Sequence, residues 1–138
     1  MSDGVSYPYQ RSITLRWKDN DVYGHVNNVE YYSFFDTAIN EFLIEEAELD
    51  IHAGSVIGVC AESRCTFKAP AAFPGELTVG LGVEHLGTSS VRYRLALTAR
   101  ERPGVLAEGS FVHVFVDRQT RQPTPIPDTV RSALESLL

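Results

Sequence analysis

The densest cluster of polar side chains in the sequence lies between residues 19 and 28, which read DNDVYGHVNN. The cluster contains two carboxylates, Asp19 and Asp21, and one imidazole, His25. An aspartate, with a reference pKa of about 3.9, is ionised at neutral pH and can act as a nucleophile or as a general base. Gly24 allows the backbone to approach a ligand closely. These residues predict an acyl-transfer site, in which a carboxylate attacks a carbonyl group or activates water.

This cluster is followed by a segment with helical periodicity. Its apolar positions recur every three or four residues, at Tyr32, Phe35, Ile39, Phe42 and Leu43. We expect the helix to begin after Asn27, capped by that side chain with Glu30 returning the bond, and to run to about residue 49. The first N–H groups of a helix lack partners within it and carry the positive end of its dipole. Backbone N–H groups from Gly24 to Asn28 are therefore expected to hold a developing oxyanion.

The rest of the chain has the alternating pattern of β-strands. Residues 10–17 alternate, which places Ile13, Leu15 and Trp17 on one side of a first strand. Further strands follow at hairpin spacing, within residues 56–68, 76–85, 90–101 and 105–117. The last of these is apolar on both faces, as in a central strand. This order predicts an α+β fold, in which a single antiparallel sheet of about five strands packs against one long helix.

A chain of 138 residues has room for one domain, which we place at 1–138. Residues 1–9 are expected to form a loose arm, and residues 128–138 a short helix capped by Asp128. A net charge of −6 argues against nucleic acid as a partner. The four histidines are scattered, which predicts no metal site. The sequence has neither a signal peptide nor a membrane-spanning run, so we expect a soluble, cytoplasmic protein that does not bind membranes.

Three expectations concern packing. Cys60 and Cys65 lie five residues apart on one strand, which would place them on opposite faces and keep them from bonding to each other. Gly80 and Gly82 share a strand face, which suggests close packing by the long helix or by the backbone of a second subunit. The strand at 76–85 is also expected to form an edge that a second copy must cover.

The run RWKDNDVYGHVNNVEYY resembles the hot-dog fold thioesterases of the 4-hydroxybenzoyl-CoA thioesterase-like family. The resemblance covers about residues 10–120, and its sharpest element is Asp-x-Asp-x-x-Gly-His-Val-Asn-Asn-x-x-Tyr, from Asp19 to Tyr31. It implies a hot-dog fold, in which the sheet wraps around the central helix, and hydrolysis of an acyl-CoA thioester without metal or organic cofactor. It places the catalytic carboxylate at Asp21 and the amide that polarises the thioester carbonyl near Asn28.

The resemblance also gives His25 a supporting part in catalysis. Relatives often carry basic residues for the CoA phosphates in the connection that here reads LGTSS, at residues 86–90. The expected phosphate contacts are therefore the hydroxyl and amide groups of Ser89 and Ser90 and the cations of Arg64, Lys68 and Arg118. An acyl-carrier protein stays open as the carrier. The expected substrate-binding residues are Gly24, Asn27, Tyr31, Arg64, Lys68, Ser89 and Ser90.

Two alternative functions stay open at this point. One is a hot-dog dehydratase or hydratase acting on the same kind of thioester, although neither Asp19 nor Asp21 has the spacing to His25 that those enzymes use. The other is a non-catalytic module that binds acyl thioesters. In each case a homodimer or homotetramer is expected, because the resemblance implies a site shared between subunits. The sequence leaves the length of the acyl group and its aliphatic or aromatic character open.

Overall fold

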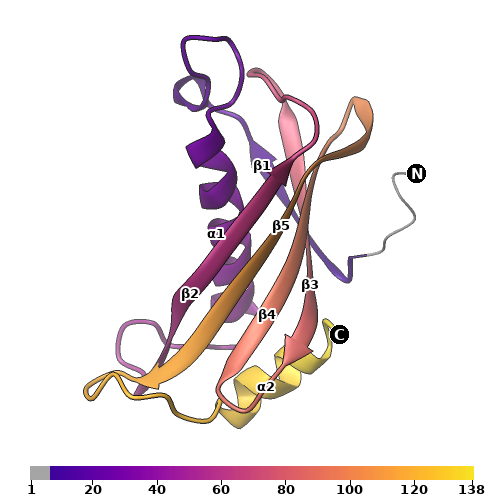
Figure 1. Cartoon of the computed structure of the whole chain (residues 1–138). Coiled ribbons are helices and arrows are strands. Elements are labelled where there is room, and N and C mark those ends of the chain that lie inside the picture. The colour runs from indigo at the N-terminus through magenta and orange to yellow at the C-terminus, as the bar shows by residue number, and fades with distance from the viewer. Residues whose placement is uncertain (1–6) are drawn as a thin grey trace.

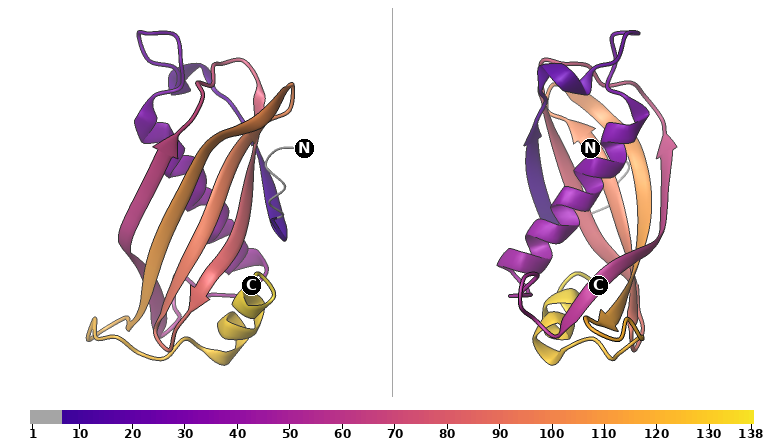
Figure 2. Two further views of the ribbon diagram at one scale, coloured as in Figure 1. Left: turned by 45° about the vertical axis from the view of Figure 1, so that its right-hand side comes forward. Right: turned by 90° about the vertical axis from the view of Figure 1, so that its left-hand side faces the viewer.

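The fold was analysed in a computed structural model, which describes residues 7–138. Five strands form one antiparallel sheet in the order β1-β3-β4-β5-β2. The helix α1 lies along one face of this sheet, and α2 packs at the end of the molecule opposite the start of α1 (Figures 1 and 2). The α+β class and the five-stranded antiparallel sheet are therefore confirmed. The elements are β1 (Tyr9–Thr14), the 3-10 turn η1 (Trp17–Asp19), α1 (Asn28–Glu45), β2 (Val56–Phe67), β3 (Glu76–Leu86), β4 (Ser90–Ala99), β5 (Arg102–Asp117) and α2 (Asp128–Glu135).

The start of α1 follows the prediction. The Asn27 side chain accepts the N–H of Val29 at 3.0 Å, as an N-cap residue does. The expected return bond from Glu30 does not form, because the N–H of Asn27 bonds to the carbonyl of Asp19 and the Glu30 carboxylate lies 3.4 Å from the ammonium of Lys18. The helix ends at residue 45 rather than near 49. Glu48 has a φ of 57°, which lies outside the range of a right-handed α-helix.

The hydrophobic core lies between α1 and the sheet. On the helix it contains Phe34, Phe35, Ala38, Ile39 and Phe42, and on the sheet Leu77, Val79, Leu81, Val83, Tyr93, Leu95 and Phe115. One glycine permits a close approach between the two layers. A Cβ atom on Gly109 of β5 would lie 2.6 Å from a ring carbon of Phe35, so only glycine leaves room for this ring. The core thereby fixes where α1 begins relative to the sheet.

The N-terminal strand is shorter than predicted. The strand β1 ends at Thr14, and Trp17 lies beyond it in the 3-10 turn with 80% of its surface exposed. The prediction that Trp17 lies on the first strand, on the same side as Leu15, is therefore wrong. The chain turns after Leu15, whose N–H bonds to the carbonyl of Gly75. Of the predicted arm at residues 1–9, Tyr9 already pairs in β1, and residues 1–6 lie outside the described part of the chain.

The strand β3 is not an edge, contrary to the prediction. It pairs with β1 on one side and β4 on the other, so β1 and β2 form the two edges of the sheet. The predicted close packing at its glycines is confirmed, but the packing groups differ from those suggested. A Cβ on Gly80 would lie 2.7 Å from the ring of Tyr7, and one on Gly82 would lie 2.8 Å from the guanidinium of Arg94. These two side chains, rather than a helix or a second backbone, cover the glycines.

The expectation that the cysteines face opposite sides of the sheet is also wrong. In the register of β2 against β5, Cys60 pairs with His113 and Cys65 pairs with Gly109. Partners four residues apart share one face of a strand, and a β-bulge between Cys60 and Glu62 supplies the extra residue. Both thiols are free. In the described part of the chain, no helix is long and apolar enough to cross a membrane.

Candidate active site

The two aspartates of the motif occupy different environments. Asp19 is fully buried, and its carboxylate accepts the Arg16 backbone N–H at 2.8 Å and the Arg16 guanidinium at 3.0 Å. Its carbonyl accepts the N–H of Asn27 at 2.9 Å. Asp19 therefore ties the end of the first strand to the start of α1. Asp21, two residues later, lies partly exposed in the connecting loop.

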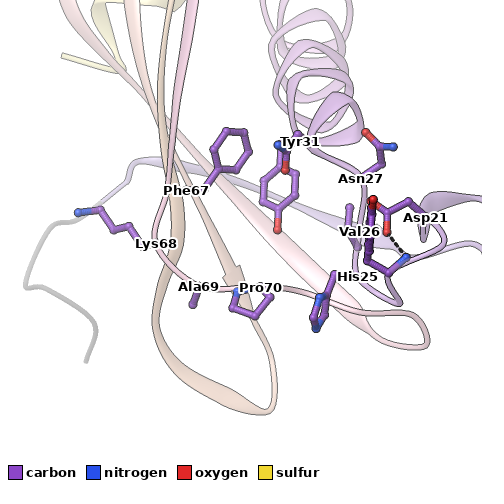
Figure 3. Close-up of a pocket in the computed structure, with 11 residues that line it drawn as sticks. Asp21, His25, Val26, Asn27, Tyr31, Phe67, Lys68, Ala69 and Pro70 are labelled. Atoms are coloured by element: carbon purple, nitrogen blue, oxygen red, sulfur yellow. Dashed lines mark hydrogen bonds between the residues drawn. The ribbon is translucent and has the colours of Figure 1, made fainter.

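The loop from Asp21 to His25 is a tight turn closed by its own backbone. The Asp21 N–H bonds to the carbonyl of His25 at 2.9 Å, and the Gly24 N–H bonds to the carbonyl of Asp21 at 3.1 Å. Gly24 has a φ of 84°, a conformation that favours glycine. The Asp21 carboxylate accepts the N–H of Tyr23 at 2.9 Å through Oδ1, the bond drawn in Figure 3. This turn holds the carboxylate at the surface of a cavity.

We call this cavity the first cavity; its volume is about 630 Å³. It lies where the end of β2 passes the start of α1, and it is drawn in Figure 3. A backbone bond from the Val26 N–H to the Ala71 carbonyl, at 2.8 Å, holds these two segments together. The residues that line it are Asp21, Tyr23, His25, Val26, Asn27, Asn28, Tyr31, Phe67, Lys68, Ala69 and Pro70.

Six of the residues predicted from the sequence meet here: Asp21, His25, Asn27, Asn28, Tyr31 and Lys68. Five other lining residues were not predicted from the sequence: Tyr23, Val26, Phe67, Ala69 and Pro70. Tyr23 and Val26 lie inside the motif and could have been included with it. Nothing local in residues 67–70 indicates that they face the motif, because that contact depends on the tertiary fold.

The start of α1 offers a backbone donor to this cavity. The Asn27 side chain accepts the N–H of Val29, and its carbonyl accepts the N–H of Glu30 at 2.9 Å. Among the described residues no hydrogen bond uses the N–H of Asn28, although Asn28 lines the cavity. A helix N-terminus with an unused N–H favours an anionic oxygen. Asn28, whose N–H is unused, and Asp21 therefore line one cavity.

Aromatic rings form the apolar wall of this cavity. Tyr31 and Phe67 pack edge to face with ring centroids 4.9 Å apart. Tyr31 is buried, and this burial raises the pKa of its hydroxyl, so the group stays neutral at physiological pH. Lys68 supplies a cation at the rim, 3.5 Å from Glu108. The first cavity thus combines a carboxylate, an imidazole, amides, an apolar wall and one ammonium group.

The other predicted binding residues lie outside this cavity. Gly24 lines a neighbouring cavity of about 430 Å³, together with Trp17, Lys18, Asn20, Asp21 and Val22. Arg64 is exposed on β2, 3.9 Å from Glu62. Ser89 and Ser90 lie at the turn between β3 and β4, at the opposite end of the molecule from the Asp21 loop (Figure 1). Within one chain, Arg64, Ser89 and Ser90 therefore line neither of the cavities that Asp21 lines. In residues 7–138 no group of three or more His, Cys, Asp or Glu side chains could hold a metal ion.

Comparison with known proteins adds three findings. Residues 15–134 match the model of the thioesterase-like superfamily. The crystal structure of the PA5185 protein from Pseudomonas aeruginosa strain PAO1 is 51% identical, with a TM-score of 0.92 over 95% of this chain and 92% of that one. Two curated relatives are more distant. The long-chain acyl-CoA thioesterase FadM of Escherichia coli is 24% identical over 94% of this chain and 98% of its own length. The 1,4-dihydroxy-2-naphthoyl-CoA hydrolase of Synechococcus elongatus is 26% identical over 95% and 96%.

Proposed function

Because the chain belongs to the thioesterase-like superfamily, we propose that it hydrolyses acyl-CoA thioesters at the cavity that contains Asp21. One observation carries this proposal: Asp21 and Asn28, whose backbone N–H is unused among the described residues, line the same cavity. Hydrolysis of a thioester needs a nucleophile or base on one side of the carbonyl carbon and a donor for the developing oxyanion. Asp21 and Asn28 supply these two groups.

The chemistry can follow either of two routes. Asp21 can attack the carbonyl carbon, which expels the thiolate and leaves an acyl anhydride that water then hydrolyses. Alternatively, Asp21 can accept a proton from water while the water oxygen attacks the same carbon. In both routes the Asn28 N–H stabilises negative charge on the carbonyl oxygen, and the thiolate takes up a proton as it leaves. We propose that His25, which lines the cavity, positions the loop or the substrate.

The acyl group is the least defined part of the substrate. One of the curated relatives is named for long-chain acyl-CoA and the other for 1,4-dihydroxy-2-naphthoyl-CoA, and both share about a quarter of their residues with this chain. The carrier is proposed to be coenzyme A, and Lys68 is the cation of the first cavity that can meet its phosphates. Acyl-carrier protein is the alternative carrier. Roles for Arg64, Ser89 and Ser90 in phosphate binding remain predictions that require a second copy of the chain.

A panel of thioesters tests the function. The wild-type protein is incubated with acetyl-, decanoyl- and benzoyl-CoA, and the free thiol is measured. Asp21→Asn keeps the size of the side chain and removes the base, so turnover of the best thioester should fall by at least about 10²-fold. Asp36→Asn is the matched control, because Asp36 lies on α1 and is not part of the first cavity. Circular dichroism checks that both variants fold. Turnover by Asp21→Asn close to that of Asp36→Asn would show that another residue carries the reaction.

A further inference from the structure

Asp21 lines two cavities. Besides the first cavity, it lines a second cavity of about 430 Å³. The other residues of the second cavity are Trp17, Lys18, Asn20, Val22 and Gly24. The two cavities therefore share Asp21. A thioester requires such an arrangement, because its carbonyl carbon carries the acyl group on one side and the sulfur of the carrier on the other.

The second cavity has an apolar surface that the fold leaves exposed. Trp17 is 80% exposed and Val22 is 93% exposed, although both side chains are hydrophobic. The Trp17 ring packs edge to face with the ring of Phe73, and the ring centroids are 5.9 Å apart. This contact restricts the orientation of the indole. Its backbone lies in the 3-10 turn that buried Asp19 holds. An aromatic side chain held in place at the surface can bind an apolar group with little loss of conformational entropy.

The charges around the two cavities differ. Beside Trp17, the Lys18 ammonium is already 3.4 Å from Glu30 and 3.9 Å from Asp19. The Arg16 guanidinium pairs with the same two carboxylates, at 3.0 Å from Asp19 and 3.8 Å from Glu30, so the charge of Lys18 is already balanced within the fold. The first cavity has Lys68 opposed by Glu108 alone, together with the amides of Asn27 and Asn28. The phosphates of the carrier therefore have a possible partner in Lys68 of the first cavity, and Trp17 and Val22 offer exposed apolar surface in the second.

From these observations we propose that the acyl group of the thioester binds in the second cavity against Trp17, and that Trp17 determines the preference for apolar acyl groups. This inference rests on the proposed function, since it takes Asp21 as the point where the carbonyl carbon lies. Trp17 would select the acyl group in the second cavity, and the carrier would bind in the first.

Tryptophan fluorescence reports on this cavity directly, because Trp17 is the sole tryptophan of the chain. The Asp21→Asn protein, in which turnover is slow, is titrated with decanoyl-CoA, with coenzyme A and with adenosine 3′,5′-bisphosphate, and calorimetry measures binding in parallel. Decanoyl-CoA should shift the emission saturably to shorter wavelength. Coenzyme A and the bisphosphate should bind with at most a small shift. An equal shift with coenzyme A, or binding of decanoyl-CoA without a shift, would overturn the proposal.

Steady-state kinetics provide a second test. Trp17→Ala should lower the ratio of kcat/KM for decanoyl-CoA over acetyl-CoA by roughly tenfold, because the apolar contact is lost only for the longer acyl group. Trp17→Phe should restore part of the ratio. Val29→Ala is the matched control, since Val29 is 70% exposed on the first turn of α1 and lines neither cavity. An unchanged ratio in Trp17→Ala, with Asp21→Asn inactive, would reject this inference and leave the thioesterase function standing. A wild-type protein that hydrolyses no thioester would reject both.

Discussion

At the scale of single residues, the two aspartates of the motif differ in burial and in their hydrogen-bond partners. Asp19 is fully buried and bound to Arg16, so its carboxylate is occupied with holding the loop. Asp21 is partly exposed at the cavity wall and takes one N–H, that of Tyr23. A carboxylate that must act on a substrate has to be reachable. The structure therefore supports the proposed catalytic role for Asp21 and explains Asp19 as a structural residue.

The first prediction at this scale concerns His25. Its side chain is exposed at the first cavity, whereas its carbonyl accepts the Asp21 N–H at 2.9 Å. His25→Ala keeps that backbone bond, so kcat for the best thioester should fall less than in Asp21→Asn, by roughly tenfold. Thiol release by the two variants, measured side by side, checks this order. If His25→Ala loses as much activity as Asp21→Asn, the imidazole is a primary catalytic group.

The candidate site could be predicted from the sequence to the extent that the motif contains it. Asp21, His25, Asn27 and Asn28 are close in sequence, and the turn before a helix keeps them close in space. Sequence reasoning could not place Phe67, which reaches the same cavity from the far end of β2. Its position depends on how the sheet packs against α1, and no local pattern encodes that packing.

At the scale of secondary-structure elements, local signals predicted starts better than ends. The capping side chain of Asn27 marks where α1 begins, because a cap acts through bonds within three residues. The end of β1 escaped prediction, since the alternation of residues 10–17 continues past the point where the chain turns. The bulge after Cys60 escaped it as well, because one extra residue in a strand leaves no mark in composition.

The prediction at this scale concerns the contact between β5 and α1. A Cβ on Gly109 would lie 2.6 Å from a ring carbon of Phe35, which is fully buried and cannot move aside. Gly109→Ala should therefore lower the free energy of unfolding by about 1–3 kcal/mol, measured by urea denaturation. Phe35→Leu in the same chain makes room for the added methyl group. The double variant should lose less stability than the sum of the two single changes, and simple additivity would show that the clash is absent.

At the scale of the whole molecule, one buried imidazole links stability to pH. His113 is 2% exposed, and its Nδ1 lies 3.3 Å from the hydroxyl of Tyr93. Burial lowers the pKa of His113 to about 4, against 6.5 as the usual value. The folded protein therefore holds this side chain neutral across a pH range in which the unfolded chain protonates it.

The sign of the effect follows from this proton difference. Between pH 6.5 and about 4 the unfolded chain binds a proton that the folded protein does not, so stability falls as the pH falls. The loss attributable to His113 should reach up to about 3 kcal/mol at the acid end. Urea denaturation at several pH values measures it. His113→Gln should show a shallower fall than wild type, and His85→Gln, which removes an exposed imidazole, should keep the wild-type fall. Equal slopes in all three proteins would refute the assignment.

The last prediction concerns assembly. The strand β2 spans 12 residues at one edge of the sheet, and from Cys60 to Phe67 all of its residues but Cys65 are exposed. A long exposed edge readily pairs with another strand, so natural proteins usually cover it. We predict that two copies of the chain associate along β2, where the sequence had suggested β3. By the family resemblance, this association brings the Asp21 loop of one copy beside strands of the other, and the monomer should be inactive.

Sedimentation at micromolar concentration should give two or four times the 15.3 kDa of the chain. Ala61→Asp adds a charge to an exposed residue in the middle of β2, and two such charges would face each other across a two-fold axis. This variant should dissociate and lose thioesterase activity together, at a protein concentration where wild type stays associated. Thr129→Asp is the control, because Thr129 is exposed on α2 and the same charge is added away from both edges. A species near 15 kDa with full turnover would disprove both the β2 interface and the shared site, because a site completed by a second copy cannot work without it.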